Sequence, residues 1–167
     1  SMKSRDAYVL DMISTILSDG KSSRLYKKMV DEKKISLQVQ AVNLGLEDYG
    51  GYVILSLPLG ENSLDDLLVN IEEEVVKLQN ELISDREYGK LQNIFENTFV
   101  SSNASMAGVA NSLARYYMLY GNTNLINDQI DIYKSITKEE IRDVARKYLK
   151  KNQRAIIDYL PKKDEAQ

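Results

Sequence analysis

Histidine and cysteine are both absent from this sequence of 167 residues. Without histidine there is no Ser-His-Asp triad, no imidazole base and no pair of histidines to hold a metal. Without cysteine there is no disulfide, no thiolate metal site and no thiol nucleophile, and the redox state of the compartment cannot be read from the sequence. We therefore expect no catalytic residue and no set of metal ligands in this chain. We also expect that the chain is not a complete hydrolase.

An excess of positive charge is also missing, because 22 Lys and Arg face 25 Asp and Glu for a net charge of −3. A nucleic-acid partner is not expected without a broad positive field. No apolar run approaches the roughly 18 residues of a membrane span, and no signal-peptide pattern is found. The hydrophobic content of 43% argues against disorder. Because one domain usually takes about 100 to 200 residues, we expect a single domain over residues 1–167.

Apolar periodicity predicts helices around one hairpin. Helical spacing covers residues 6–17, and a second helix begins at Ser22 or Ser23, carries Val30 on its apolar stripe and ends in the charged run 31–34. A period of two over residues 35–41 puts Leu37 on the inward face of a strand, which pairs with residues 52–57 in an antiparallel hairpin.

The rest of the chain is predicted to be helical, except for a final strand. Helices are predicted over residues 62–82, from the capping box of Ser84, over residues 104–120 and 125–136, and from the capping box of Thr137. Residues 154–160 form a closing strand stopped by Pro161, and residues 162–167 a polar tail. The fold class is therefore α+β, with a small antiparallel sheet covered on one face by several helices.

Two motifs are similar to functional sites but have simpler structural interpretations. The segment Gly20-Lys21-Ser22-Ser23 is similar to the end of a phosphate-binding loop, but Thr15 stands where the first glycine belongs, so a capped linker is favoured. The acidic run 72–74 is favoured as a solvated helix face, because neighbouring helical residues point in different directions.

A third motif, Arg115-Tyr116-Tyr117, could contact a peptide by hydrogen bonds and stacking. Tyr117 is predicted on the buried stripe, while Arg115 and Tyr116 project elsewhere. Ordinary amphipathic packing is the simpler interpretation, and Arg115 and Tyr116 stay as candidate peptide contacts.

The stretch Leu17-Ser18-Asp19-Gly20-Lys21-Ser22-Ser23-Arg24-Leu25-Tyr26 resembles the non-catalytic, inactive-type C-terminal domain of the insulinase/pitrilysin family of zinc metallopeptidases. The resemblance continues through Asp48-Tyr49-Gly50-Gly51-Tyr52, Ala110-Asn111-Ser112-Leu113-Ala114 and Tyr148-Leu149, and so covers nearly the whole chain. It implies a half-domain of the insulinase and mitochondrial processing peptidase type, which closes a chamber around a peptide. A homologous catalytic half would hold zinc in an H-x-x-E-H motif, which this chain does not contain.

In active relatives the companion half supplies an arginine and, seven residues later, a tyrosine, which hold the substrate near zinc. The resemblance puts these positions at Val30 and Leu37, which are both apolar here. The domain is therefore expected to act mainly as chamber wall and structural partner, and whether it belongs to an enzyme stays open.

We interpret residues 1–167 as a non-catalytic domain of a zinc metalloendopeptidase. We expect it to be excised from a longer two-half chain, with an upstream strand missing. The alternatives are a structural, non-proteolytic core-type subunit and an unrelated ligand-binding α+β domain. Expected partners are a catalytic half-domain, a peptide substrate and, through an exposed sheet edge, a second copy of the chain. The sequence does not decide between the cell envelope or periplasm and the cytoplasm of a bacterium.

Overall fold

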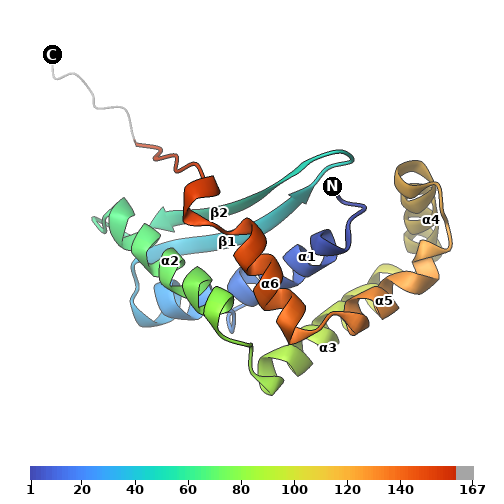
Figure 1. Ribbon diagram of the computed structural model, residues 1–167, viewed down its shortest axis with the longest axis horizontal. Helices are drawn as coiled ribbons and strands as arrows, with labels where there is room; N and C mark the ends of the chain where they lie inside the picture. Colours follow the sequence, from blue (N-terminus) through green and yellow to red (C-terminus); the bar gives the residue numbers. More distant parts are fainter. Residues whose placement is uncertain (161–167) are drawn as a thin grey trace, which may run out of the picture.

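The computed structural model describes residues 1–160 and has one β-hairpin among helices (Figure 1). The elements in chain order are α1 Arg5–Ser18, the π-helix η1 Tyr26–Glu32, β1 Ser36–Gly45, β2 Gly50–Pro58, α2 Leu64–Asn80, α3 Asp85–Ser102, α4 Met106–Tyr120, α5 Leu125–Ser135, α6 Lys138–Tyr148 and the 3-10 turn η2 Lys151–Gln153. The antiparallel sheet and its helices confirm the predicted α+β class. The predicted stop at Pro161 and the polar tail lie outside the described residues.

Helix α1 lies at the centre of the core. Ser4 caps its first turn by accepting a hydrogen bond from the Ala7 amide. Its buried residues cover a broad stripe and comprise Ala7, Val9, Leu10, Met12, Ile13, Ile16 and Leu17. The helix therefore packs against β1 on one side and against α3, α5 and α6 on others.

A β-bulge at the start of β1 reverses the predicted inward position of Leu37. Ser36 pairs with Pro58 and Gln38 with Leu57, so Leu37 has no cross-strand partner. The Ser36 hydroxyl is buried and lies within hydrogen-bond distance of the Gln38 and Leu57 carbonyl oxygens, at 2.8 and 2.9 Å. Leu37 is consequently 60% exposed, and its predicted burial is wrong.

The second predicted helix exists, but most of it is a π-helix. The predicted serine cap is wrong, because the buried Ser23 hydroxyl donates to the Gly20 carbonyl instead of accepting a first-turn amide. At its end Lys34 adopts the left-handed conformation with φ 52°, and the next amide, that of Ile35, donates to the Met29 carbonyl at 2.9 Å. This reversal directs the chain into β1.

The predicted capping boxes are present at the starts of α3 and α6, where Ser84 pairs with Glu87 and Thr137 with Glu140. Helix α6 packs on α1 and α2, and Gln79 of α2 donates to the Leu149 carbonyl at 2.8 Å. Local capping signals therefore located these helix boundaries correctly.

Helix α4 presents the opposite face from the one predicted. Tyr117 was expected on a buried stripe but is 70% exposed, and Met106 is 92% exposed. Tyr116 is half-buried instead. A Cβ at Gly108 would overlap the Ser102 carbonyl oxygen, so this glycine permits the close approach of α4 to the end of α3. The helix lies at the far end of the α3 and α5 arm, away from the start of the sheet (Figure 1).

Residues 154–160 do not form the predicted strand. They are irregular and exposed, with Ile157 88% and Tyr159 94% accessible. A strand needs a neighbouring edge for its backbone groups, and the edge of β1 that faces away from β2 is engaged in part. The Ser18 hydroxyl accepts from the Ala41 amide at 2.7 Å, and just after the strand the Met2 amide donates to the Leu46 carbonyl at 2.9 Å. None of the helices within residues 1–160 is long and apolar enough to cross a membrane.

The acidic run of α2 is not simply solvated. Glu74 is only 5% exposed and lies 3.0 Å from Lys28 and 2.8 Å from Lys77. Burial opposes ionisation of Glu74, but hydrogen bonds from Lys77 and Lys28 outweigh it and lower its pKa. This part of the prediction is wrong, because the sequence does not show that η1 packs against α2.

A second ion pair joins the segment before η1 to α3. Arg24 donates to both carboxylate oxygens of Glu87, at 2.8 and 2.9 Å. These hydrogen bonds lower the pKa of Glu87, which also belongs to the capping box of Ser84. One carboxylate therefore stabilises both a helix start and a tertiary contact.

We expect Lys34→Gly to stabilise the fold by about 1 kcal/mol, because a side chain with positive φ is strained and glycine is not. The melting temperature should rise by about 2 to 4 °C in thermal unfolding followed by circular dichroism. Lys34→Ala is the control, since it removes the side chain but keeps a Cβ. Equal melting temperatures for the two variants would show that the backbone is not strained here.

We expect Glu87→Gln to destabilise the fold by about 1 to 2 kcal/mol at neutral pH in urea unfolding. Because the folded pKa of Glu87 is lowered, its contribution is present above the ordinary pKa of about 4.3 and is lost as the pH falls through the lower folded value. The parent should therefore lose more stability than the variant on acidification. The control is Glu96→Gln, at a residue of the same helix as Glu87. It breaks an exposed ion pair with Lys134 of α5 and should cost less than about 0.5 kcal/mol. Equal effects of the two variants would contradict the proposed importance of the Arg24 pair.

Candidate functional site

The four residues singled out from the sequence form two separate pairs. Val30 and Leu37 belong to η1 and the start of β1, which contact each other. Arg115 and Tyr116 belong to α4, at the other end of the molecule (Figure 1). The structure therefore does not bring the four residues into one site.

The first pair offers little for holding a substrate. Val30 is half-buried and packs against the core, while Leu37 is exposed at the bulge. Neither side chain has a polar atom that could hydrogen-bond a peptide or stabilise an oxyanion. Of these two side chains, only that of Leu37 lies on an accessible surface.

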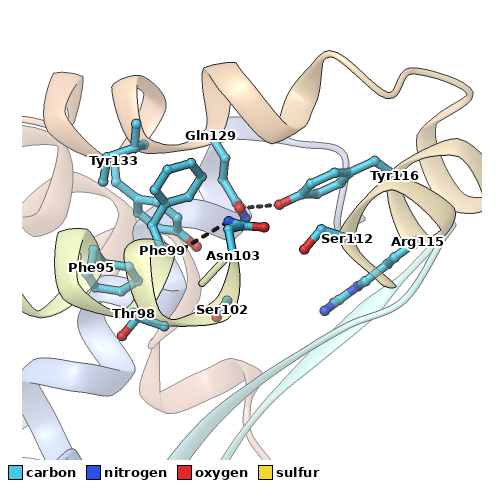
Figure 2. A pocket seen from close by; sticks show the side chains of 11 residues that line it. Phe95, Thr98, Phe99, Ser102, Asn103, Ser112, Arg115, Tyr116, Gln129 and Tyr133 are labelled. Atoms are coloured by element: carbon cyan, nitrogen blue, oxygen red, sulfur yellow. Dashed lines mark hydrogen bonds between the residues drawn. The ribbon is translucent and has the colours of Figure 1, made fainter. Parts of the chain in front are cut away.

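The second pair lines a pocket of about 260 Å³ between α3, α4 and α5. Figure 2 shows its side chains converging from the three helices. The lining residues are Phe95, Thr98, Phe99, Ser102, Asn103, Ser112, Arg115, Tyr116, Gln129, Ile130 and Tyr133. The structure therefore brings Arg115 and Tyr116 together in one place.

Tyr116 closes one side of the pocket. Its hydroxyl donates to Gln129 Oε1, which joins α4 to α5 (Figure 2). Burial raises the pKa of Tyr116, although the charge of Arg115 acts in the opposite direction. The phenol therefore stays neutral at physiological pH and acts here as a hydrogen-bond donor.

Aromatic rings form the floor. Phe95 and Tyr133 are stacked with ring centroids 4.2 Å apart, and Tyr8 meets the edge of Tyr133 at 5.2 Å. The Tyr133 hydroxyl donates to Asp11 Oδ2 at 3.1 Å, and Asn43 donates to Asp11 Oδ1 at 2.9 Å. The floor is thus fixed to α1 and to the hairpin.

Asp11 is the ionisable group beneath this floor. Burial raises its pKa, and the hydrogen bonds from Asn43 and Tyr133 together with the charge of Arg115 oppose that effect. Both carboxylate oxygens have protein partners. Asp11 therefore orients Tyr133 and is not itself among the lining residues.

Sequence reasoning missed most of this pocket. The apolar spacing of α3 predicts Phe95 and Phe99 on its inward face, but nothing in the sequence singles out Asn103, Gln129 or Tyr133. Asp11 gave one signal, because it is a charged residue between the apolar residues Leu10 and Met12 of α1. The sequence could not show which helices meet around it.

Zinc does not fit this chain. It contains no histidine or cysteine, and within residues 1–160 no three Asp or Glu side chains are grouped so that they could hold a metal ion. Structural and catalytic zinc sites in proteins depend on such ligands.

Comparison with known proteins identifies a family of peptidase domains. A family model described as the peptidase M16 inactive domain matches residues 1–95. The zinc protease PqqE of Helicobacter pylori is 25% identical over 161 residues, which are 96% of this chain and 36% of that protein. This chain therefore spans about a third of that relative.

Solved structures share the fold. A crystal structure of a protease from Helicobacter pylori matches with a TM-score of 0.85 and 25% identity, over 92% of this chain and 37% of that one. The inactive peptidase domain of a Bordetella parapertussis protein matches with a TM-score of 0.80 and 20% identity, over 99% of this chain and 90% of that one.

The family match covers more than half of the chain and includes α1, η1, the hairpin and α2. It confirms the resemblance to a non-catalytic domain of zinc metallopeptidases that the sequence motifs indicated. The chain belongs to the peptidase M16 inactive-domain family.

Proposed function

We propose that this chain is the non-catalytic half of a zinc metalloendopeptidase and completes a chamber around a peptide whose zinc site lies in a companion half. The observation that carries the proposal is the family match of a chain that has neither histidine nor cysteine. The role of the chain is then to bind the companion and to hold and enclose the peptide.

The outer face of the hairpin supports a companion. On the hairpin face that points away from α1, β2 carries the exposed apolar residues Val53, Leu55 and Leu57, at 43%, 51% and 46%. On β1, the exposed polar residues Gln40 and Gln38 lie opposite Leu55 and Leu57. Leu37 adds to this face because of the bulge. A row of exposed apolar side chains of this kind is typical of a protein interface. The companion half is the proposed occupant, and self-association is the expected substitute when it is absent.

Reconstitution tests the function. The companion half that carries H-x-x-E-H is expressed alone and together with this chain, and cleavage of a quenched fluorescent peptide is measured. We expect cleavage by the complex and much less by either part alone. A stable complex that cleaves no more than the companion alone would contradict the peptidase role and favour the structural core-type subunit.

We expect this chain, purified alone, to bind zinc only substoichiometrically, because it lacks the side chains that zinc prefers. The zinc content of the complex should equal that of the companion alone. Elemental analysis of dialysed protein gives the measurement. One tightly held zinc per isolated chain would contradict the assignment of the metal to the companion half.

We expect the two apolar positions to respond differently to the family residues. Val30→Arg should destabilise the fold by about 1 to 3 kcal/mol, because it places a charge against the core, whereas Leu37→Tyr should change stability by less than about 0.5 kcal/mol at its exposed site. Urea unfolding gives both values.

Val76→Arg is the matched control for Val30→Arg, since Val76 is 49% exposed on α2 and should tolerate the charge. If Val30→Arg is as mild as Val76→Arg, residue 30 faces solvent and the core assignment is wrong. The double variant Val30→Arg with Leu37→Tyr is then tested in the reconstituted complex. A gain in kcat with little change in KM would indicate transition-state stabilisation.

A further inference from the structure

The pocket between α3, α4 and α5 has a buried acceptor without a donor. Asn103 ends α3, and its side-chain nitrogen donates to the Phe99 carbonyl at 3.0 Å. Its other polar atom, Oδ1, is buried and has no hydrogen-bond partner in the part of the chain that the structure describes. A buried acceptor that lacks a donor is destabilising, and a ligand with an N–H group would relieve this cost.

The pocket also has a cation without a counterion. Arg115 forms no ion pair with any side chain of residues 1–160. Figure 2 shows its side chain extending from α4 into the open space between α4 and α3. No lining residue is acidic. The pocket is therefore suited to an anionic group and not to an ammonium.

The pocket is small, with an aromatic floor and with Thr98, Ser102, Ser112 and Gln129 among its polar lining residues. Phe95, Phe99 and Tyr133 provide aromatic faces, and the volume of about 260 Å³ is below the roughly 300 to 1,000 Å³ of sites for drug-sized ligands. One amino-acid residue is a better match in size. The site thus combines an apolar floor, an acceptor for N–H and a cation.

We propose that this pocket binds the C-terminal residue of a peptide that ends in an aromatic or large aliphatic side chain. The side chain packs on the floor of Phe95, Phe99 and Tyr133, the last peptide N–H donates to Asn103 Oδ1, and the terminal carboxylate pairs with Arg115. A free amino acid matches less well, because its ammonium has no acidic partner among the lining residues. This inference deepens the proposed peptide-holding function and rests on it.

Binding is tested on this chain alone by titration followed by NMR, with N-acetyl-phenylalanine as the probe. Three analogues alter the recognised groups. The C-terminal amide lacks the carboxylate, 3-phenylpropionate lacks the acetamido group with its N–H, and free phenylalanine has an ammonium in place of the acetamido group. We expect saturable shifts of pocket residues and binding of N-acetyl-phenylalanine that is about tenfold tighter than that of each analogue.

Variants assign the contacts. Arg115→Gln should remove the difference between N-acetyl-phenylalanine and its amide, whereas Arg86→Gln, the same change at an exposed arginine of α3, should leave it intact. Ser112→Leu fills part of the pocket and should abolish the shifts without lowering the melting temperature by more than a few degrees. Should Ser112→Leu unfold, the comparison of Arg115→Gln with Arg86→Gln decides alone.

Equal binding of the acid and its amide, shifts outside the pocket, or equal effects of the two arginine variants would overturn the proposal. Tighter binding of free phenylalanine would overturn it in favour of an amino-acid site. The test needs neither zinc nor the companion half. A failure here therefore rejects the pocket, whereas failure of reconstitution rejects the peptidase role.

Discussion

Burial of α1 is the constraint on which the other elements depend. Its apolar residues occupy positions 9, 10, 12, 13, 16 and 17, so a single-sided contact could not cover them. The hairpin covers one side through Val39 and Ala41, and α6 and α3 cover others with residues such as Ile141 and Leu91. The one acidic residue of this segment, Asp11, is accommodated by Asn43 and Tyr133, which fixes the hairpin and α5 relative to α1. The pocket floor is thus a by-product of how α1 is buried.

Local signals in the sequence predicted most of the elements and several of their ends, but the strand predicted over residues 154–160 is absent. The capping boxes at Ser84 and Thr137 specify backbone hydrogen bonds between residues three apart, so no tertiary information is needed. The same is true of Gly121, which ends α4 with φ 66°. In contrast, the bulge at Leu37 goes with contacts of the buried Ser36 hydroxyl to the Gln38 carbonyl on its own strand and to the Leu57 carbonyl on the partner strand. Alternation of side chains predicts a strand but not a one-residue shift within it.

The orientation of α4 shows why the candidate site could be predicted only in part. The helix has no fully buried residue and carries apolar or aromatic side chains on two sides, with Met106 and Tyr117 on one and Val109 and Tyr116 on the other. Periodicity cannot choose between two such stripes. The choice follows from tertiary contacts, namely the close approach at Gly108 and the hydrogen bond from Tyr116 to Gln129. Arg115 and Tyr116 were identified from the sequence, but their shared pocket depends on Phe95, Asn103 and Tyr133 from other helices.

The fold has exposed apolar side chains in one place and polar groups without partners in another, and the two features suit different partners. The exposed apolar residues of the hairpin lack polar specificity and suit a large surface, because apolar contact is non-directional. The pocket instead has a buried oxygen at Asn103 and a charge at Arg115 without partners in the described residues, which suit a small ligand with defined donor and anion positions. The substituted pair Val30 and Leu37 has neither property. In the proposed function, the polar groups that hold the peptide would therefore lie at the α4 end of the molecule, and the hairpin face would be left for contact with the companion half.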